Sequence, residues 1–393
     1  HYPAALLDAQ VHVEMLRRLG KTTRASGTSI EISESRIPDT TLNWDGRSIR
    51  NTLLSLGALT TRMGAGRVPL PGGCRLGDRR YDLHVNVLEA LGARVWEDDG
   101  FLCAEAPANG LTGAEIHLPL RSTGATENAI LCGTLARGVT RVWNPHVRPE
   151  ILDLIALLKK MGARIEVFGQ QHIEITGVEE LHGAEHDVIA DSVEAVTWLV
   201  GSVMTGGDVE IDNFPFDDLE VTLAHLKAAG AQLYRNDSAL IVRGGTCYPI
   251  DISTGPHPGI NSDIQPILAA WAARATGESR VVDLRFPGRY GYAREMANMG
   301  LRHEIRGDML VLQGAGGNLQ AATVRALGLG ARAGPHRRAL LAAGHAAAAV
   351  LGEALGVVRR EAGGAEHELG ALGAVVAVAA GQADLGPHGG DAL

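Results

Sequence analysis

One short pattern recurs along the chain and restricts its possible folds more than any other feature. In each copy an amphipathic segment ends at a glycine, usually followed by alanine, and a β-branched or apolar run comes next, as in LEALGARV, LKKMGARI and LKAAGAQL. The glycines of the six copies lie 72, 70, 68, 70 and 73 residues apart, and they are Gly20, Gly92, Gly162, Gly230, Gly300 and Gly373. Such a regular spacing indicates an internal structural repeat.

Each of these glycines is expected to end a helix, because the residue after a helix often takes the left-handed conformation that favours glycine. Between copies, a second apolar helix leads through a glycine-containing turn to another strand, as in VEAVTWLVGSVMTGGDVEIDN. A unit of about 70 residues is too long for an ordinary solenoid repeat. The sequence therefore predicts an α/β protein with two domains of three units each, residues 1–187 and 188–393.

The two ends of the chain depart from this regularity. Gly20 lies only 20 residues from the start, so the first unit is expected to be truncated at its N-terminal side. After Tyr292 no aromatic residue occurs and after Ile305 no isoleucine, and from about residue 314 alanine, glycine, arginine and histidine dominate. This composition is poor in strand formers. The hypothesis is that part of this atypical tail is translated out of frame or has diverged.

Charge and cysteine content exclude several classes of protein. The net charge of −9, without a basic helix, argues against a nucleic-acid binder. The most apolar stretch, residues 339–358, contains His345 and Glu353 and makes a poor membrane span. No signal peptide opens the sequence. The chain has four cysteines, Cys74, Cys103, Cys132 and Cys247. Their spacing fits neither a zinc motif nor a secreted disulfide framework. We expect a cytoplasmic monomer that acts on small molecules and contacts no membrane.

The stretch LPGGCRLGDRRYDLH, residues 70–84, places Cys74 behind two glycines and beside Arg75, Arg79 and Arg80. Neighbouring cations favour the reactive thiolate, although a half-buried structural cysteine fits the same residues. The stretch resembles the mobile loop of the UDP-N-acetylglucosamine enolpyruvyl transferases. The resemblance continues from about Leu16 to about Leu312, through RSIRNTLLSLGALTTRMGAGRV, STGATENAILCGTLARG, GPHPGINSDIQPILAA and FPGRYGYAREM. On these ordered matches the chain is identified as a member of the enolpyruvyl transferase family.

This resemblance implies a fold and a reaction. The fold is EPSP synthase-like, with two inside-out α/β barrels built from six βαβαββ units and an active site between them. The reaction moves the enolpyruvyl group of phosphoenolpyruvate to an acceptor hydroxyl and releases phosphate, without cofactor or metal. The expected acceptor is the 3-hydroxyl of UDP-N-acetylglucosamine, in peptidoglycan biosynthesis.

The resemblance also implies roles for individual residues. Cys74 corresponds to the loop thiol linked to proton transfer, and Asp263 to the general base. From the sequence alone Asp263 fits a helix cap before an apolar run. The resemblance assigns phosphoenolpyruvate to Arg50, Arg79 and Arg289. It assigns the nucleotide to Arg79, Asp82, His84, Ser122, Thr123, Gly124 and Thr126, of which the last four precede or begin an apolar helix whose free amides suit an anion. A plain N-cap explains the same RSTGATEN stretch.

The match also has departures. The family's early Lys-Asn pair would precede this sequence, and of its late Asp-Leu-Arg motif only Arg332 lies nearby. The family's RPxDLH has Arg80 in place of its proline, and its PDRxE has become ADSVE, residues 190–194. Two alternatives therefore stay open: transfer to the 3′-hydroxyl of UMP in peptidyl-nucleoside antibiotic biosynthesis, or a catalytically silent nucleotide-binding paralogue. A repeat scaffold for protein partners does not explain the clustered motifs.

Overall fold

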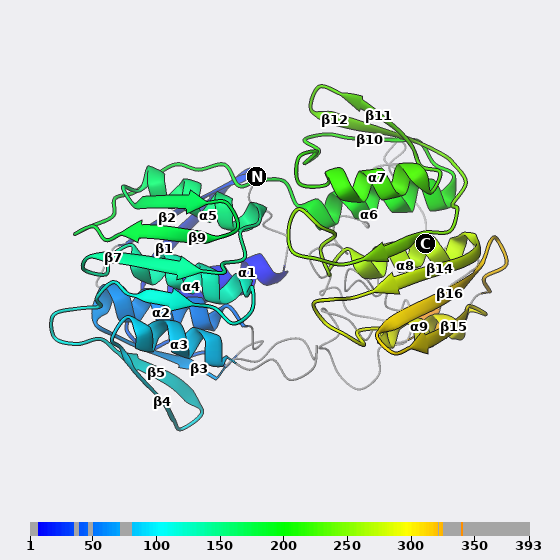
Figure 1. Cartoon of the computed structure of the whole chain (residues 1–393). Helices are drawn as coiled ribbons and strands as arrows, with labels where there is room; N and C mark the ends of the chain where they lie inside the picture. The colour runs from blue at the N-terminus through cyan, green and yellow to red at the C-terminus, as the bar shows by residue number, and fades with distance from the viewer. Residues whose placement is uncertain are drawn as a thin grey trace, which may run out of the picture. The chain divides into compact units, whose positions relative to one another are not determined.

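A computed structural model describes residues 7–34, 39–45, 50–70, 81–320, 322–324 and 339–340 (Figure 1). The chain separates into two compact lobes. The N-terminal lobe contains the described residues from Val11 to Ile189, and the C-terminal lobe contains those from Ala190 onward. The domain boundary expected after residue 187 stays a prediction, as does the nature of the tail, most of which lies outside the described residues. None of the described helices is long and apolar enough to cross a membrane.

One complete repeat of the N-terminal lobe shows how the unit is built. Its elements are β6 (Glu115–His117), α4 (Thr123–Gly133), β7 (Val139–Trp143), α5 (Pro149–Lys160), β8 (Arg164–Phe168) and β9 (His172–Thr176). The strands form one sheet in the order β6-β7-β9-β8. The first pair is parallel and the other two pairs are antiparallel. This is a βαβαββ unit, in which α4 makes the crossover that a parallel pair requires.

The C-terminal lobe contains the same unit. Its elements are β13 (Asp251–Ser253), α8 (Gln265–Arg274), β14 (Thr276–Val282), α9 (Gly291–Ala297), β15 (Arg302–Arg306) and β16 (Met309–Ala315). The sheet order, β13-β14-β16-β15, matches that of the N-terminal repeat position by position. The parallel first pair and the antiparallel hairpin recur as well.

Two further repeats have a shorter first strand or none. One consists of α2 (Thr52–Met63), β3 (Ala65–Pro69), α3 (Asp82–Ala90), β4 (Arg94–Asp98) and β5 (Phe101–Glu105). There a single parallel bridge from Thr41 to Arg67 takes the place of the first strand. The other consists of α6 (Ser192–Thr205), β10 (Val209–Ile211), α7 (Glu220–Ala228), β11 (Gln232–Asn236) and β12 (Ala239–Arg243). Both sheets keep the remaining order, β3-β5-β4 and β10-β12-β11.

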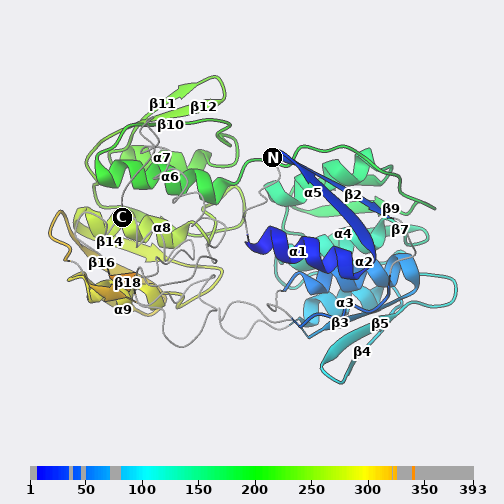
Figure 2. The ribbon, with the colours of Figure 1, turned by 180° about the vertical axis from the view of Figure 1, so that it is seen from behind.

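The first described elements correspond to the final part of a repeat that ends its helix at Gly20. This part is α1 (Leu7–Arg18) followed by the antiparallel hairpin β1 (Lys21–Ser26) and β2 (Ser29–Glu34), which Figure 2 shows from behind. Glu34 accepts hydrogen bonds from Lys21 and Arg62, so the hairpin is also tied to α2. In the atypical tail, β17 (Thr323–Val324) pairs with β18 (Ala339–Leu340).

The repeat glycines end helices as predicted. Gly92, Gly162, Gly230 and Gly300 have φ of 96°, 104°, 103° and 92°. The amide of Gly92 donates to Glu89 O at 2.9 Å, and that of the next residue, Ala93, donates to Leu88 O at 2.9 Å. The other three glycines show the same two bonds, which define a Schellman motif. Gly20 has φ 96°, and Gly373 lies outside the described residues.

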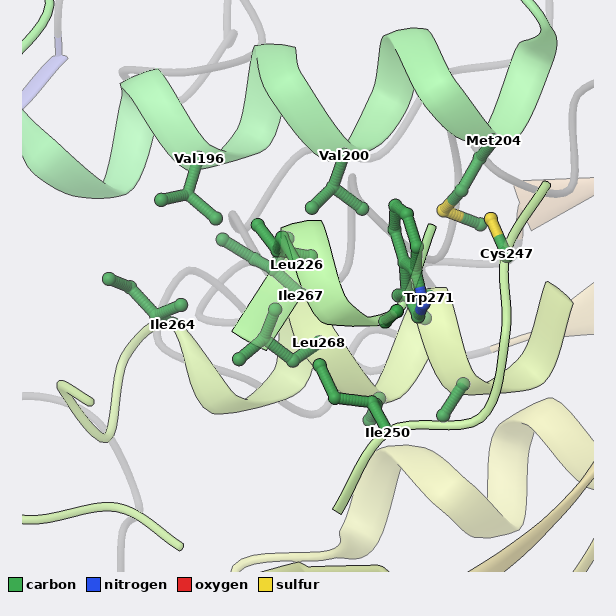
Figure 3. Packing of buried hydrophobic residues seen from close by; sticks show 14 of the residues in the cluster. Val196, Val200, Met204, Leu226, Cys247, Ile250, Ile264, Ile267, Leu268 and Trp271 are labelled. Atoms are coloured by element: carbon green, nitrogen blue, oxygen red, sulfur yellow. The ribbon is translucent and has the colours of Figure 1, made fainter. Parts of the chain in front are cut away.

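Helices form the interior of each lobe and sheets its outside (Figures 1 and 2). In the C-terminal lobe every residue of α8 from Gln265 to Ala273 is buried, as expected of a helix enclosed on all sides. Figure 3 shows Ile267 and Trp271 of α8 facing Val196 and Val200 of α6. The Trp271 indole donates to Tyr248 O at 2.9 Å, which satisfies its buried N–H.

Candidate active site

The start of α4 in the N-terminal lobe holds four of the predicted nucleotide-binding residues. Ser122 is the N-cap, and its Oγ accepts from the Ala125 amide at 3.3 Å. Thr126 Oγ1 donates to Ser122 O at 2.7 Å and accepts from the His146 amide at 3.0 Å. Thr123 Oγ1 lies 2.9 Å from His146 Nδ1. The plain N-cap interpretation is therefore correct for Ser122, and the role of these residues toward a nucleotide stays a prediction.

The structure brings His84 of α3 directly onto this helix start. A Cβ on Gly124 would lie 2.9 Å from both Cε1 and Nε2 of His84, so a side chain there would collide with the ring. On its other side the ring is held by Asn128, whose Nδ2 lies 3.3 Å from His84 Nδ1. Asn128 is completely buried and rests against Gly57 of α2. His84 and Gly124, predicted from separate motifs, are thus neighbours.

The electrostatics of this cluster favour an uncharged histidine. Burial, with a smaller contribution from the charge of Arg50, lowers the pKa of His84 to about 4, whereas Asp82 opposes the shift. A neutral ring that accepts from Asn128 at Nδ1 carries its proton on Nε2, the atom that faces Gly124. Arg50, Asp82 and His84 therefore interact around the start of α4, where free helix amides suit an anion.

Glu127 of α4 is a further candidate that sequence reasoning did not assign to the site, although it lies inside the quoted motif RSTGATEN. Burial, with a smaller contribution from the charge of Glu150, raises the pKa of Glu127 to about 7, while Arg148 opposes the rise. Arg148 and Glu150 form an ion pair of 2.5 Å at the start of α5. A carboxyl group that titrates near neutrality is typical of functional sites.

In the C-terminal lobe the structure joins Asp263 and Arg289, which are 26 residues apart in the sequence. Arg289 Nη1 donates to Asp263 Oδ1 at 2.9 Å. The Arg289 side chain is 12 % exposed and that of Asp263 is 38 % exposed, so the carboxylate is the more accessible partner. The helix α8 has no side-chain cap at its N-cap, Ile264. The carboxylate of Asp263 therefore pairs with a cation and does not cap the helix.

Behind this pair lies a buried polar network that the sequence did not reveal. Asp283 is completely buried, and its Oδ2 accepts from Ser262 Oγ at 2.6 Å. Ser262 Oγ in turn accepts from Arg289 Nη1 at 3.2 Å. Gln265 is also fully buried and donates through Nε2 to Tyr292 Oη. The sequence gives little indication of this network, because polar residues such as Asp283 follow many strands of the chain.

Two of the predicted site residues, and the one arginine near the late family motif, lie outside the described part of the chain. Cys74 and Arg79 fall in residues 71–80, and Arg332 falls in the tail. Among the described residues, no group of three or more histidine, cysteine, aspartate or glutamate side chains is placed to hold a metal ion. The three described cysteines, Cys103, Cys132 and Cys247, are buried free thiols.

Comparison with known proteins identifies the family. The model of the EPSP synthase (3-phosphoshikimate 1-carboxyvinyltransferase) family matches residues 3–332. The UDP-N-acetylglucosamine 1-carboxyvinyltransferase of Azorhizobium caulinodans is 42% identical over 293 residues, which cover 74% of this chain and 68% of the relative. The enzyme of the same name from a Caulobacter species is 37% identical over 343 residues, covering 87% of this chain and 78% of the relative.

Solved structures show the same fold. The enolpyruvyl transferase NikO from Streptomyces tendae superposes with a TM-score of 0.71 at 24% identity, over 90% of this chain and 81% of that one. An EPSP synthase from Acinetobacter baumannii gives a TM-score of 0.62 at 21% identity, over 79% and 74% of the two chains. These likenesses confirm the predicted inside-out α/β architecture. The chain belongs to the EPSP synthase family and is an enolpyruvyl transferase.

Proposed function

We propose that the protein transfers the enolpyruvyl group of phosphoenolpyruvate to the 3-hydroxyl of UDP-N-acetylglucosamine and releases phosphate. The names of its relatives in Azorhizobium caulinodans and Caulobacter support this acceptor. The observation that carries the proposal is the ion pair between Asp263 and Arg289 at the start of α8. It places a half-exposed carboxylate and a largely buried guanidinium side by side, as a reaction between a hydroxyl and an anion requires.

Asp263 acts as the general base in this proposal. Its carboxylate takes the proton of the acceptor hydroxyl while the hydroxyl oxygen bonds to C2 of phosphoenolpyruvate, and the methylene carbon receives a proton. Loss of phosphate and of a methyl proton then restores the enol double bond, now in the product. We assign the acid that protonates the methylene to Cys74, on the strength of the sequence motif alone. In the family's terms this is an addition followed by an elimination.

Arg289 binds the carboxylate of phosphoenolpyruvate. Its Nη1 is occupied by Asp263 and Ser262, whereas among the described residues Nε and Nη2 have no hydrogen-bond partner. A guanidinium edge of this kind suits a bidentate carboxylate. We propose that Arg50 and Arg79 bind the phosphate of phosphoenolpyruvate. The assignment of Arg79, like that of Cys74, is based on the sequence motif.

The N-terminal lobe binds the nucleotide in this proposal. The start of α4 offers backbone amides to the diphosphate, and the neutral His84 offers its Nε2 proton beside Gly124. Ser122, Thr123 and Thr126 shape the same helix start through their hydroxyl groups. The resemblance assigns the uracil end to Asp82, at the start of α3, and to His84, and it assigns Arg79 to both substrates. The enzyme is proposed to work as a cytoplasmic monomer.

A second acceptor, the 3′-hydroxyl of UMP, is favoured by the changes around the nucleotide-binding motifs. Tyr81 is the N-cap residue of α3, and its hydroxyl donates to Glu97 of β4. Asp191, in the altered ADSVE segment, caps α6 by accepting from the amides of Val193 and Glu194 at 2.8 and 3.1 Å. Both residues serve local structure, and the family pattern is lost at their neighbours, where Arg80 replaces its proline and Ser192 its arginine, as expected where the acceptor has changed.

A phosphate-release assay tests the proposal. The protein is incubated with phosphoenolpyruvate and either UDP-N-acetylglucosamine or UMP, and we expect release with the sugar nucleotide. Release with UMP alone would establish the second acceptor, and no release with either would indicate a silent paralogue. The variant Asp263→Asn should lose activity by at least about a hundredfold, as expected when a general base is removed. The exposed Asp237→Asn is the matched control and should retain it.

A further inference from the structure

The C-terminal lobe contains a buried carboxylate that the proposed chemistry does not use. Asp283, the residue directly after β14, has an exposed fraction of 0 %. Its two oxygens accept hydrogen bonds from Ser262 Oγ at 2.6 Å and from Thr254 Oγ1 at 2.9 Å. The amides of Arg285 and Phe286 each donate to Oδ1 at 3.0 Å. A buried charge is stable only when it is paired or fully hydrogen-bonded, and these four donors meet that condition.

One oxygen of Asp283 is connected to the candidate active site. Ser262 Oγ donates to Asp283 Oδ2 and accepts from Arg289 Nη1 at 3.2 Å. The same nitrogen donates to Asp263 Oδ1 at 2.9 Å. Because the hydroxyl proton of Ser262 points to Asp283, its lone pairs are turned toward the guanidinium. The Asp283 carboxylate therefore fixes the orientation in which the Ser262 hydroxyl accepts the hydrogen bond from Arg289.

The other oxygen holds the backbone that leads to Arg289. Oδ1 accepts from the amides of the turn after β14, and Phe286 in this turn lies under the guanidinium of Arg289, 5.6 Å from ring centroid to Cζ. Thr254 Oγ1 joins the same oxygen to the loop after β13 and accepts from the Leu284 amide at 3.0 Å. The hydrogen bonds of Oδ1 thus stabilise the local backbone, whereas Oδ2 binds Ser262. Substitutions of the partners of each oxygen can therefore test the two roles separately.

The repeat allows a comparison between equivalent positions. Asn144 directly follows β7, as Asp283 follows β14, and its Oδ1 accepts from Arg121 Nε at 3.2 Å. Asp212 directly follows β10 and is exposed, and among the described residues it has no hydrogen-bond partner for its side chain. Two repeats thus use this position to hold an arginine, directly or through a serine. The third repeat shows that the unit folds without such a contact.

We propose that Asp283 is a positioning residue of the enolpyruvyl transfer. Acting through Ser262, it holds Arg289 in the orientation in which Arg289 pairs with Asp263 and binds the carboxylate of phosphoenolpyruvate. Asp283 itself does not touch a substrate. This inference rests on the proposed function of Arg289 and Asp263, and it assigns their orientation to Asp283 and Ser262.

Steady-state kinetics of Asp283→Asn and Ser262→Ala test the inference. In Asp283→Asn the amide nitrogen faces the Ser262 hydroxyl, so that hydrogen bond must reverse or break, while Ser262→Ala removes the connecting hydroxyl. We expect each variant to raise KM for phosphoenolpyruvate about tenfold, the usual effect of losing one charge-assisted hydrogen bond. KM for the acceptor should stay within about twofold. The double variant should be no worse than the poorer single one, because both changes break one chain of contacts.

Two control variants separate positioning from a loss of structure. Thr254→Val removes a hydrogen bond to the other oxygen of Asp283 and should lower the melting temperature without the rise in KM. Asp212→Asn changes the equivalent carboxylate of the neighbouring repeat and should behave as wild type. The inference is overturned by a wild-type KM for phosphoenolpyruvate in Asp283→Asn, by losses that multiply in the double variant, or by the same rise in Thr254→Val. If Asp283→Asn does not fold, Ser262→Ala decides alone.

The failure of the proposed function gives a different result. If the wild-type protein releases no phosphate with either acceptor, crystal structures of wild type and Ser262→Ala test the positioning instead. We expect Arg289 to leave Asp263 in the variant. An unchanged distance of 2.9 Å between Nη1 and Oδ1 would refute the inference, whatever the reaction.

Discussion

At the scale of single residues, His84 and Gly124 show how two motifs depend on each other. The imidazole occupies the space that a side chain at position 124 would need, since a Cβ there would lie 2.9 Å from two ring atoms. The ring has little freedom to move because Asn128, fully buried, holds its other nitrogen. The position of the His84 ring therefore requires a glycine at the start of α4. This requirement is separate from any need to let a ligand approach the helix amides.

The first prediction concerns Gly124→Ala. The added methyl group displaces the His84 ring and weakens acceptor binding, so KM for the acceptor should rise about tenfold, and overpacking should cost about 1–3 kcal/mol of stability. Steady-state kinetics and urea unfolding measure the two effects. Gly183→Ala is the matched control, since a Cβ there meets nothing within 4 Å. An acceptor KM equal to that of wild type would show that His84 has no part in binding.

The second prediction concerns pH. The pKa of His84 is lowered to about 4 in the folded protein, below its ordinary value of 6.5. The unfolded chain therefore binds more protons between these values, and stability falls as the pH falls from about 6.5 to about 4, by up to about 3 kcal/mol. Above pH 6.5 the full contribution is present. Urea unfolding across this range should show a shallower pH dependence for His84→Asn than for wild type.

The control for this pH dependence is His117→Asn, which removes an exposed histidine from β6. It should leave the slope of stability against pH unchanged. If His84→Asn and wild type have equal slopes, then His84 titrates in the folded protein much as it does in the unfolded chain.

At the scale of elements, the helix-ending glycines of the repeat differ in their surroundings. Gly300 and Gly230 both have left-handed backbones, with φ of 92° and 103°. A Cβ on Gly300 meets nothing within 4 Å, whereas one on Gly230 would lie 2.3 Å from Thr246 O and 2.6 Å from the Tyr248 ring. The first glycine is required only by its backbone conformation, and the second also by close packing of the chain.

The third prediction compares alanine at these two positions. Gly300→Ala should cost about 1–2 kcal/mol, the strain of a left-handed L-residue. Gly230→Ala should cost more than about 3 kcal/mol, because a backbone oxygen has to move as well. Chemical unfolding of both variants provides the comparison. Gly300→Asn, with a residue that tolerates this conformation, should lose less than Gly300→Ala. An equal loss of unfolding free energy in Gly300→Ala and Gly230→Ala would contradict the view that close packing adds to the backbone strain at Gly230.

The elements also show what the sequence could predict and where it stopped. Helix ends at Gly92, Gly162 and Gly230 were predictable because a left-handed cap is local chemistry. The pairing of Asp263 with Arg289 was not, because it depends on the loop after β14 returning to the start of α8. Asp283 gave no signal, since its proposed role depends on Ser262 and Thr254, two hydrogen-bonding neighbours that are distant in sequence. The motif around Asp263 suggested its importance, but also an N-cap that the structure does not show.

At the scale of the whole molecule, each lobe has its own interior. The core cluster of the C-terminal lobe draws all of its fully buried members from residues between Ala195 and Leu319. In the N-terminal lobe, Leu53 and Leu56 of α2 and Ala129 and Ile130 of α4 are buried in the same manner. Two separate cores in one chain favour unfolding in more than one step, as is usual for multidomain proteins.

The fourth prediction uses Trp271 to distinguish the two lobes. Trp271 is fully buried at the centre of the C-terminal core, and truncation to alanine should cost about 3–5 kcal/mol. In calorimetry we expect wild type to show two overlapping transitions, of which Trp271→Ala lowers only one, by roughly 10 °C for a lobe of this size. Trp96→Ala, at a partly buried tryptophan of β4, should affect only the other transition, and to a lesser extent. A single transition that moves as a whole in both variants would mean that the lobes unfold as one cooperative unit, and the separate cores would then not be independent in stability.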